Sequence, residues 1–86
     1  MPKVADLPRK IRVAQHYDEH PPPHFHAIQG DDEVLLCISD LSIYTGGLAG
    51  PALRCVRAWA HVHRAELLAN WASAEANGPL RRISYP

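Results

Sequence analysis

A strand that buries one face alternates apolar and polar residues, and the first half of the chain contains such a segment. Ile11 to His16 alternates in this way and predicts a first strand. Three more strands are predicted: His24 to Ile28 after the triple proline, the apolar run Val34 to Ile38, and the short segment Leu41 to Thr45. The connections between the later strands are short and carry turn residues such as Gly30-Asp31-Asp32. Connections of this length favour antiparallel pairing.

The second half has the period of a helix. Gly50-Pro51 precedes it, and proline suits the first helical turn. The run is alanine-rich from Pro51 to about Ala76, where Asn77-Gly78-Pro79 is a strong stop signal. One long helix is therefore predicted, with an apolar stripe formed by Leu53, Val56, Ala60, Leu67, Trp71 and Ala74. The expected fold class is α+β: a small antiparallel sheet of three to four strands packed against one long C-terminal helix, with Leu80 to Tyr85 as a further short edge strand.

The 86 residues form a single domain, 1–86, of which 47% are apolar. A chain of this size is near the lower limit for a self-sufficient core, which favours a homodimer or a bound protein partner. No segment is long and apolar enough to span a membrane, and no hydrophobic signal-like run follows Met1. Cys37 and Cys55 lie within apolar patterns, as reduced packing residues of a cytoplasmic protein do.

Charged residues are segregated along the chain although the net charge is zero. Every Lys and Arg lies at or before Arg12, or at or after Arg54. One interpretation is that the basic ends pair with the acidic middle in the fold. The other is a basic face for a phosphate backbone, in which Arg54, Arg57 and Arg64 on one flank of the helix would contact nucleic acid.

The segment from Glu19 to Ala27 holds three of the six histidines beside a carboxylate and a triple proline. The prolines stiffen the connector, and alternation on the following strand places His24 and His26 on the same face. Either face of the sheet is open to them, because Phe25 could equally take the inner one. The histidines could brace the loop through hydrogen bonds. They could instead hold a divalent metal such as zinc or manganese, with His20, His24, His26 and His63 as the candidate ligands.

One edge of the predicted helix carries Trp59, His63, Glu66 and Asn70, spaced by three and four residues, so that they are neighbours in space. One interpretation gives these residues purely structural roles. Trp59 can be a core residue, and His63 can be satisfied by Glu66 one turn away. The alternative is that this edge approaches the histidine loop and completes a shared site.

The loop and the helix together resemble a small bacterial family, domain-of-unknown-function family 4160. Its members pair a Glu-His-x-Pro-Pro-His-Phe-His-Ala loop with a Trp-x3-His-x2-Glu-Leu-x2-Asn-Trp helix. These motifs match Glu19 to Ala27 and Trp59 to Trp71. The resemblance implies no established activity, and it implies a setting suggestive of toxin–antitoxin pairs.

These observations lead to two hypotheses of different classes. In the first, the chain is a small cytoplasmic binding or regulatory module, an antitoxin-like partner of another small protein. Its binding residues would be Glu19, His20, His24, His26, Trp59, His63, Glu66 and Asn70. In the second, the histidine cluster holds the metal of a hydrolase or nuclease, with Glu19 or Glu66 as the general base. The sequence contains no nucleophilic serine motif, phosphate-binding loop or dinucleotide fingerprint, so other enzyme classes are not indicated.

Overall fold

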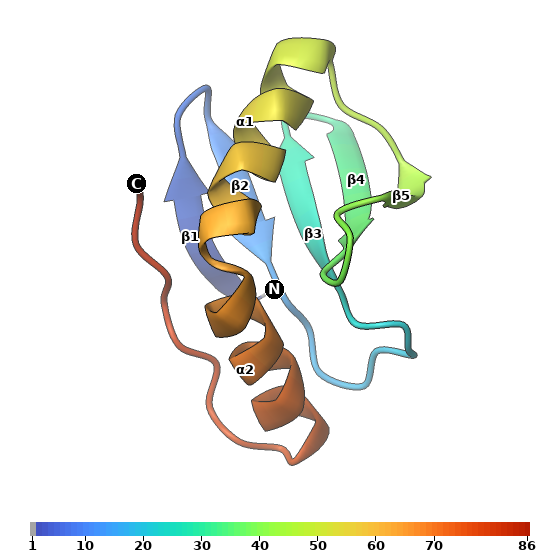
Figure 1. The fold of residues 1–86 in the computed structure, drawn as a ribbon, viewed down its shortest axis with the longest axis vertical. Helices are drawn as coiled ribbons and strands as arrows, with labels where there is room; N and C mark the ends of the chain where they lie inside the picture. Colours follow the sequence, from blue (N-terminus) through green and yellow to red (C-terminus); the bar gives the residue numbers. More distant parts are fainter. Residues whose placement is uncertain (1) are drawn as a thin grey trace.

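The structure is a computed structural model and describes residues 2–86. Its elements are β1 (Lys3–Leu7), β2 (Ile11–Ala14), β3 (His24–Gln29), β4 (Asp32–Cys37), β5 (Ile43–Gly46), α1 (Gly50–Val62) and α2 (Arg64–Glu75). The strands form one antiparallel sheet in the order β1-β2-β3-β4-β5. The two helices lie over one face of this sheet (Figure 1). The α+β class expected from the sequence is therefore confirmed.

Alternation along β3 places Phe25 and Ala27 on the face of the sheet that meets the helices, while His24 at the start of the strand also contacts Trp71 of α2. Phe25 and Ala27 are completely buried in the core, and Val13 and Val34 flank Ala27 on the neighbouring strands. His26 lies between Phe25 and Ala27 in the sequence, so its side chain belongs to the opposite face of the sheet. The sequence left open which face of the sheet carries Phe25. In the structure Phe25 lies on the inner face, where the edge of its ring meets the ring of Trp59.

The sheet has five strands rather than the three to four expected, because β1 was not predicted. Its residues do not alternate strictly: Val4 and Ala5 are both buried, and the pairing with β2 shifts register between Lys3 and Ala5. Such an irregularity removes the period-two signal from a short strand. Each of the four predicted strands is present, with ends that differ from the prediction by at most two residues.

The helical region is divided at His63, where one long helix was expected. His63 has φ −105° and ψ 21°, outside the helical range, and it ends α1 and precedes α2. Its side chain is buried and contacts both Glu66 and the carbonyl oxygen of Pro86. The apolar stripe is otherwise as predicted: five of its six residues are buried, and Leu53 packs against the core partly buried.

The C-terminal segment runs beside β1 without forming the expected edge strand at Leu80 to Tyr85. A single backbone hydrogen bond joins it to the sheet, from Ile83 N to Val4 O at 2.7 Å. Side chains of the helices hold the rest: Trp59 Nε1 donates to Ser84 O at 2.9 Å, and Asn70 bonds the backbone of Arg81. The backbone of this segment therefore forms most of its hydrogen bonds with helix side chains and not with a neighbouring strand.

Candidate functional site

The connector between β2 and β3 carries the first part of the site, and it is anchored at several points. Gln15 is buried and donates through Nε2 to Leu67 O at 3.0 Å. Tyr17 Oη donates to Gly78 O at 2.7 Å, and Pro23 O accepts a hydrogen bond from Ile38 N at 3.0 Å. A connector tied at its beginning, middle and end presents its remaining side chains in defined positions.

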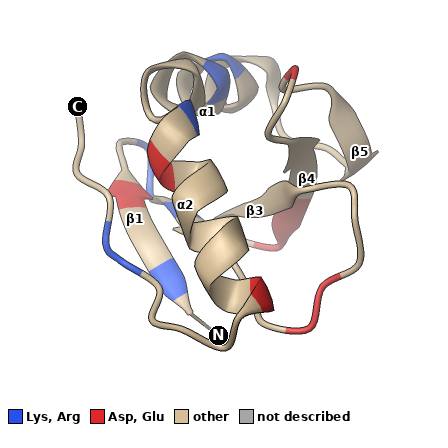
Figure 2. Ribbon diagram, turned by 60° about the horizontal axis from the view of Figure 1, so that its bottom comes forward, with Lys and Arg blue, Asp and Glu red and all other residues tan. Residues whose placement is uncertain are grey.

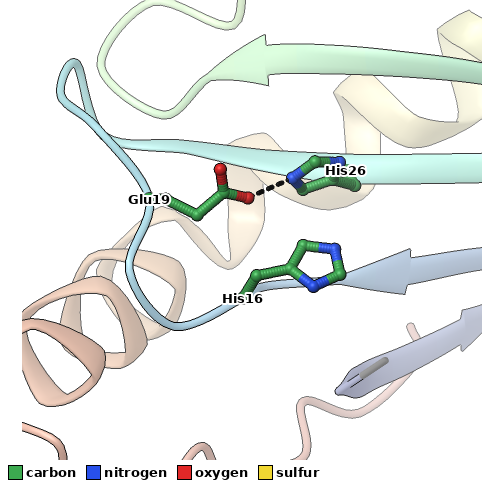
Figure 3. Close-up of side chains that lie close together, drawn as sticks. All are labelled: His16, Glu19 and His26. Atoms are coloured by element: carbon green, nitrogen blue, oxygen red, sulfur yellow. Dashed lines mark hydrogen bonds and ion pairs between the residues drawn. The ribbon is translucent and has the colours of Figure 1, made fainter.

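His26 is the centre of the polar cluster. Its Nε2 lies 2.5 Å from Glu19 Oε1, and its Nδ1 lies 2.8 Å from Glu33 Oε2. The ring of His16 meets it edge-on, with centroids 4.4 Å apart. Figure 3 shows His16 and Glu19 reaching from the connector toward His26 on β3. Both ring nitrogens of His26 thus face a carboxylate oxygen, which accepts hydrogen bonds.

His24 is buried beside this cluster with one nitrogen unsatisfied. Its Nδ1 lies 2.9 Å from Pro22 O, a carbonyl that can only accept, so Nδ1 carries the proton. Its ring lies between those of Tyr44 and Trp71, with centroids 5.5 and 5.3 Å away. Its Nε2 is buried, has no hydrogen-bond partner in the described chain, and faces Glu19 Oε2 at 3.4 Å. Buried polar atoms without partners are rare in folded proteins and point to a missing interaction.

The cluster changes the ionisation of two of its members. Partial burial opposes ionisation of Glu19, but the hydrogen bond from His26 and the neighbouring His26, His24 and His16 outweigh it and lower the pKa of Glu19. Burial, followed by the charge on His26, lowers the pKa of His16. Glu19 is therefore an anion near neutral pH, and His16 is held in its neutral form, which has a free lone pair.

A pocket of about 250 Å³ opens between the connector and α2, next to this cluster. It is lined by His16, Asp18, Glu19, Trp71, Ala74 and Glu75. Three of these residues are acidic, and one supplies an indole ring. The pocket thus joins the polar cluster to the end of α2, a combination that the two sequence motifs did not reveal.

His63 and Glu66 form a second constellation with different partners. His63 Nδ1 lies 2.5 Å from Glu66 Oε1, and His63 Nε2 lies 3.1 Å from Pro86 O. The ring of His63 is 5.2 Å from that of Trp59, whose indole N–H is taken by Ser84 O. Among residues 2–86, no hydrogen bond or ion pair joins these side chains to the histidine connector. The structural interpretation named the pair of His63 with Glu66; the contacts of His63 and Trp59 with the C-terminal segment were not predicted.

Asn70 also has a structural position. It is 3% exposed, and its Nδ2 donates to Gln15 Oε1 at 3.0 Å and to Arg81 O at 2.9 Å. Its Oδ1 accepts from Arg81 N at 2.9 Å. The amide group has little left to offer a ligand, because its two donor hydrogens and one acceptor position are engaged.

The predicted metal set of His20, His24, His26 and His63 does not converge. His20 is exposed, and His63 has the partners described above. Within the described chain, one group of three metal-ligating side chains comes together: His16, Glu19 and His26. His16 was not among the predicted site residues. Antiparallel pairing of Ala14 with His26 could have indicated it, because that register brings the residues just after β2 to the histidine end of β3.

The arginine flank holds a loop as well as facing solvent. Arg57 Nε donates to Leu41 O at 3.0 Å, and Arg64 Nε donates to Ile38 O at 2.9 Å. Both bonds fasten the segment between β4 and β5 to the helices, while Arg54 is exposed. Nucleic-acid binding by these arginines stays a prediction.

Comparison with protein families identifies the chain. The family model described as a domain of unknown function, DUF4160, matches residues 10–72, a span that contains the connector, β3 and most of α2. The chain belongs to this family, as the two motifs indicated. Comparisons with curated proteins and with solved structures gave no match. Neither α1 nor α2 has the length and apolar character needed to cross a membrane, and no other helix occurs in residues 2–86.

Proposed function

We propose that this member of the DUF4160 family is a small binding module, an antitoxin-like regulatory partner of another protein, and that its pocket receives a basic side chain of that partner. One observation carries the proposal: three carboxylates and an indole surround a single pocket. Carboxylates attract a guanidinium or ammonium group, and an indole face adds cation–π attraction.

The charge distribution supports a basic partner. Asp18 and Glu75 form no ion pair with any residue in the range 2–86. No Lys or Arg occurs between Arg12 and Arg54, so the connector and β3 to β5 contain no permanently basic side chain. Figure 2 shows acidic segments in the connector and at the end of α2 on the same side of the molecule. A pocket with two carboxylates that lack ion pairs in the described chain selects cationic partners and disfavours a second copy of the same surface.

The pocket also has the size and rigidity that recognition requires. A volume of about 250 Å³ is enough for one long side chain rather than for a large ligand. Trp71 is almost fully buried, and Gln15 and Tyr17 anchor the opposite wall to α2 and Gly78. Little conformational entropy is therefore lost when a side chain enters, which favours binding.

The test compares two short peptides that differ in one residue, arginine or citrulline, which have the same shape but different charge. NMR titration of the full chain should show shifts of the Trp71 indole and of residues 16–19 and 71–75 with the arginine peptide, and much smaller shifts with citrulline. Equal responses to both peptides, or shifts centred on other residues, would contradict the proposal that the pocket recognises a positively charged side chain.

A pair of double variants supplies the matched control. Asp18→Asn with Glu75→Gln removes two charges from the pocket, whereas Asp31→Asn with Asp32→Asn removes two exposed charges from the β3–β4 turn. At about 0.5–1 kcal/mol for each partly exposed charge, the pocket variant should bind the arginine peptide roughly tenfold more weakly. The turn variant should change affinity only by the small effect of net charge. Equal losses of peptide affinity in both variants would mean that the peptide responds to the net charge of the protein and not to the carboxylates of the pocket.

A further inference from the structure

The polar cluster has the features of a metal site, and no other group of described side chains has them. Ligand atoms of His16, Glu19 and His26 lie within 4.8 Å of one another. Donors around a tetrahedral zinc ion, with bonds of about 2.1 Å, are about 3.4 Å apart. Small side-chain rotations would therefore bring these three groups to bonding distance.

The hydrogen bonds of His26 have the form found around ligating histidines. A histidine that binds a metal through one nitrogen usually donates its other N–H to a carboxylate or carbonyl. His26 Nδ1 bonds Glu33, and His26 Nε2 points at Glu19. An ion at Nε2 would take the place of a proton there, and Glu33 would orient the ring through its hydrogen bond with Nδ1.

His24 provides the independent second observation. Its Nδ1 lies 2.9 Å from Pro22 O, and its Nε2 faces the carboxylate of Glu19 at 3.4 Å. This Nε2 is buried and has no hydrogen-bond partner in the described chain. A cation between Nε2 and the Glu19 oxygen would satisfy both atoms at once.

We propose that His16, Glu19 and His26 form a binding site for a divalent transition-metal ion such as zinc, with His24 Nε2 available as a further ligand. Imidazole and carboxylate donors suit zinc, copper and nickel better than magnesium or calcium, which prefer oxygen alone. The site opens to the pocket, so an ion can enter without unfolding the chain. This inference goes beyond the proposed recognition of a basic side chain and does not depend on it.

The experiment titrates zinc alone into full-length protein without a histidine tag, by calorimetry in competition with a chelator. One equivalent per chain is expected, and cobalt(II) should give the absorption of a low-coordinate nitrogen and oxygen site. His16→Ala should weaken zinc binding at least tenfold, because it removes a ligand. Glu33→Ala should weaken it by about 10–100-fold, because it removes the hydrogen bond that orients the His26 ring.

Matched controls separate this site from general histidine binding. His20→Ala removes an exposed histidine of the same connector and should leave zinc affinity unchanged. The Asp18→Asn, Glu75→Gln variant should also retain zinc, so that failure of either proposal can be recognised separately. The inference is overturned if the parent binds no zinc, or if His16→Ala binds it as tightly as the parent. Backbone NMR spectra of each variant establish that it is folded.

Discussion

Replacing Asn70 with Ala should strongly destabilise the protein. The amide joins three parts of the chain: it lies on α2, donates to Gln15 in the connector, and exchanges two hydrogen bonds with the backbone of Arg81. Gln15 is itself 2% exposed and bonds back to Leu67 O. Removing the amide leaves Gln15 Oε1 without this donor in a place from which water is excluded.

The magnitude follows from these contacts. A typical intramolecular hydrogen bond contributes about 1 kcal/mol net, and a buried group left unsatisfied costs about 1–3 kcal/mol. Three lost bonds and one orphaned buried oxygen together predict a decrease of about 4–6 kcal/mol in the free energy of unfolding. A domain of this size is expected to have a total stability of about 4–13 kcal/mol, so the change is a large part of the whole.

Urea denaturation of the parent and the variants measures this decrease. Asn70→Asp keeps the acceptor for Arg81 N but turns a carboxylate oxygen toward Gln15 Oε1, so it should be at least as harmful near neutral pH. Ser73→Ala is the control, because Ser73 Oγ bonds Pro79 O at 2.6 Å in an exposed position on the same helix. It should cost less than about 1 kcal/mol. A loss that small for Asn70→Ala would refute the structural role and return Asn70 to the recognition residues.

Other predictions concern the core, the connector and a loop. Leu67→Ala removes a fully buried side chain and should lower the free energy of unfolding by about 2–5 kcal/mol in urea denaturation. Pro22→Gly should increase the mobility of His24 more than that of α2, as seen in NMR order parameters, because it frees the backbone that holds the ring. The backbone N–H and the hydroxyl of Ser42 lower the pKa of Asp40. Ser42→Ala should raise that pKa part of the way in an NMR titration. Because the folded pKa is the lower one, the contribution of Asp40 is present above its unfolded pKa and lost as pH falls through the folded value.

The parts of the fold that the sequence predicted are those with a regular period. Leu67 and Trp71 could be assigned to the buried stripe because side chains three and four apart share a helix face. The strand at His24 to Ile28 could be predicted from its alternation and the prolines before it. The division of the helix at His63 could not, because no Gly or Pro marks it and its contact with Pro86 joins residues 23 apart.

Only the parts of the site that depend on local sequence features were predicted. The histidine connector stood out because His24 and His26 share a face and follow the prolines, both of which are local features. His16 did not stand out, since its role depends on the register between β2 and β3. Glu33 is brought to His26 by the pairing of β3 with β4, and Glu75 reaches the pocket only through the packing of α2. Sequence spacing carries no signal for contacts of these kinds.

The two proposals meet at Glu19, and this shared residue links their affinities. An ion held by His16, Glu19 and His26 would neutralise one of the three pocket carboxylates and add positive charge beside Asp18 and Glu75. Zinc should therefore weaken binding of the arginine peptide. Linkage requires that the peptide weaken zinc binding by the same factor, because both routes lead to the same doubly bound state. Titrating each ligand in the presence and absence of the other measures both factors. Unequal factors would show incomplete equilibration or a second binding place, and a factor of one would mean that the basic group does not contact Glu19.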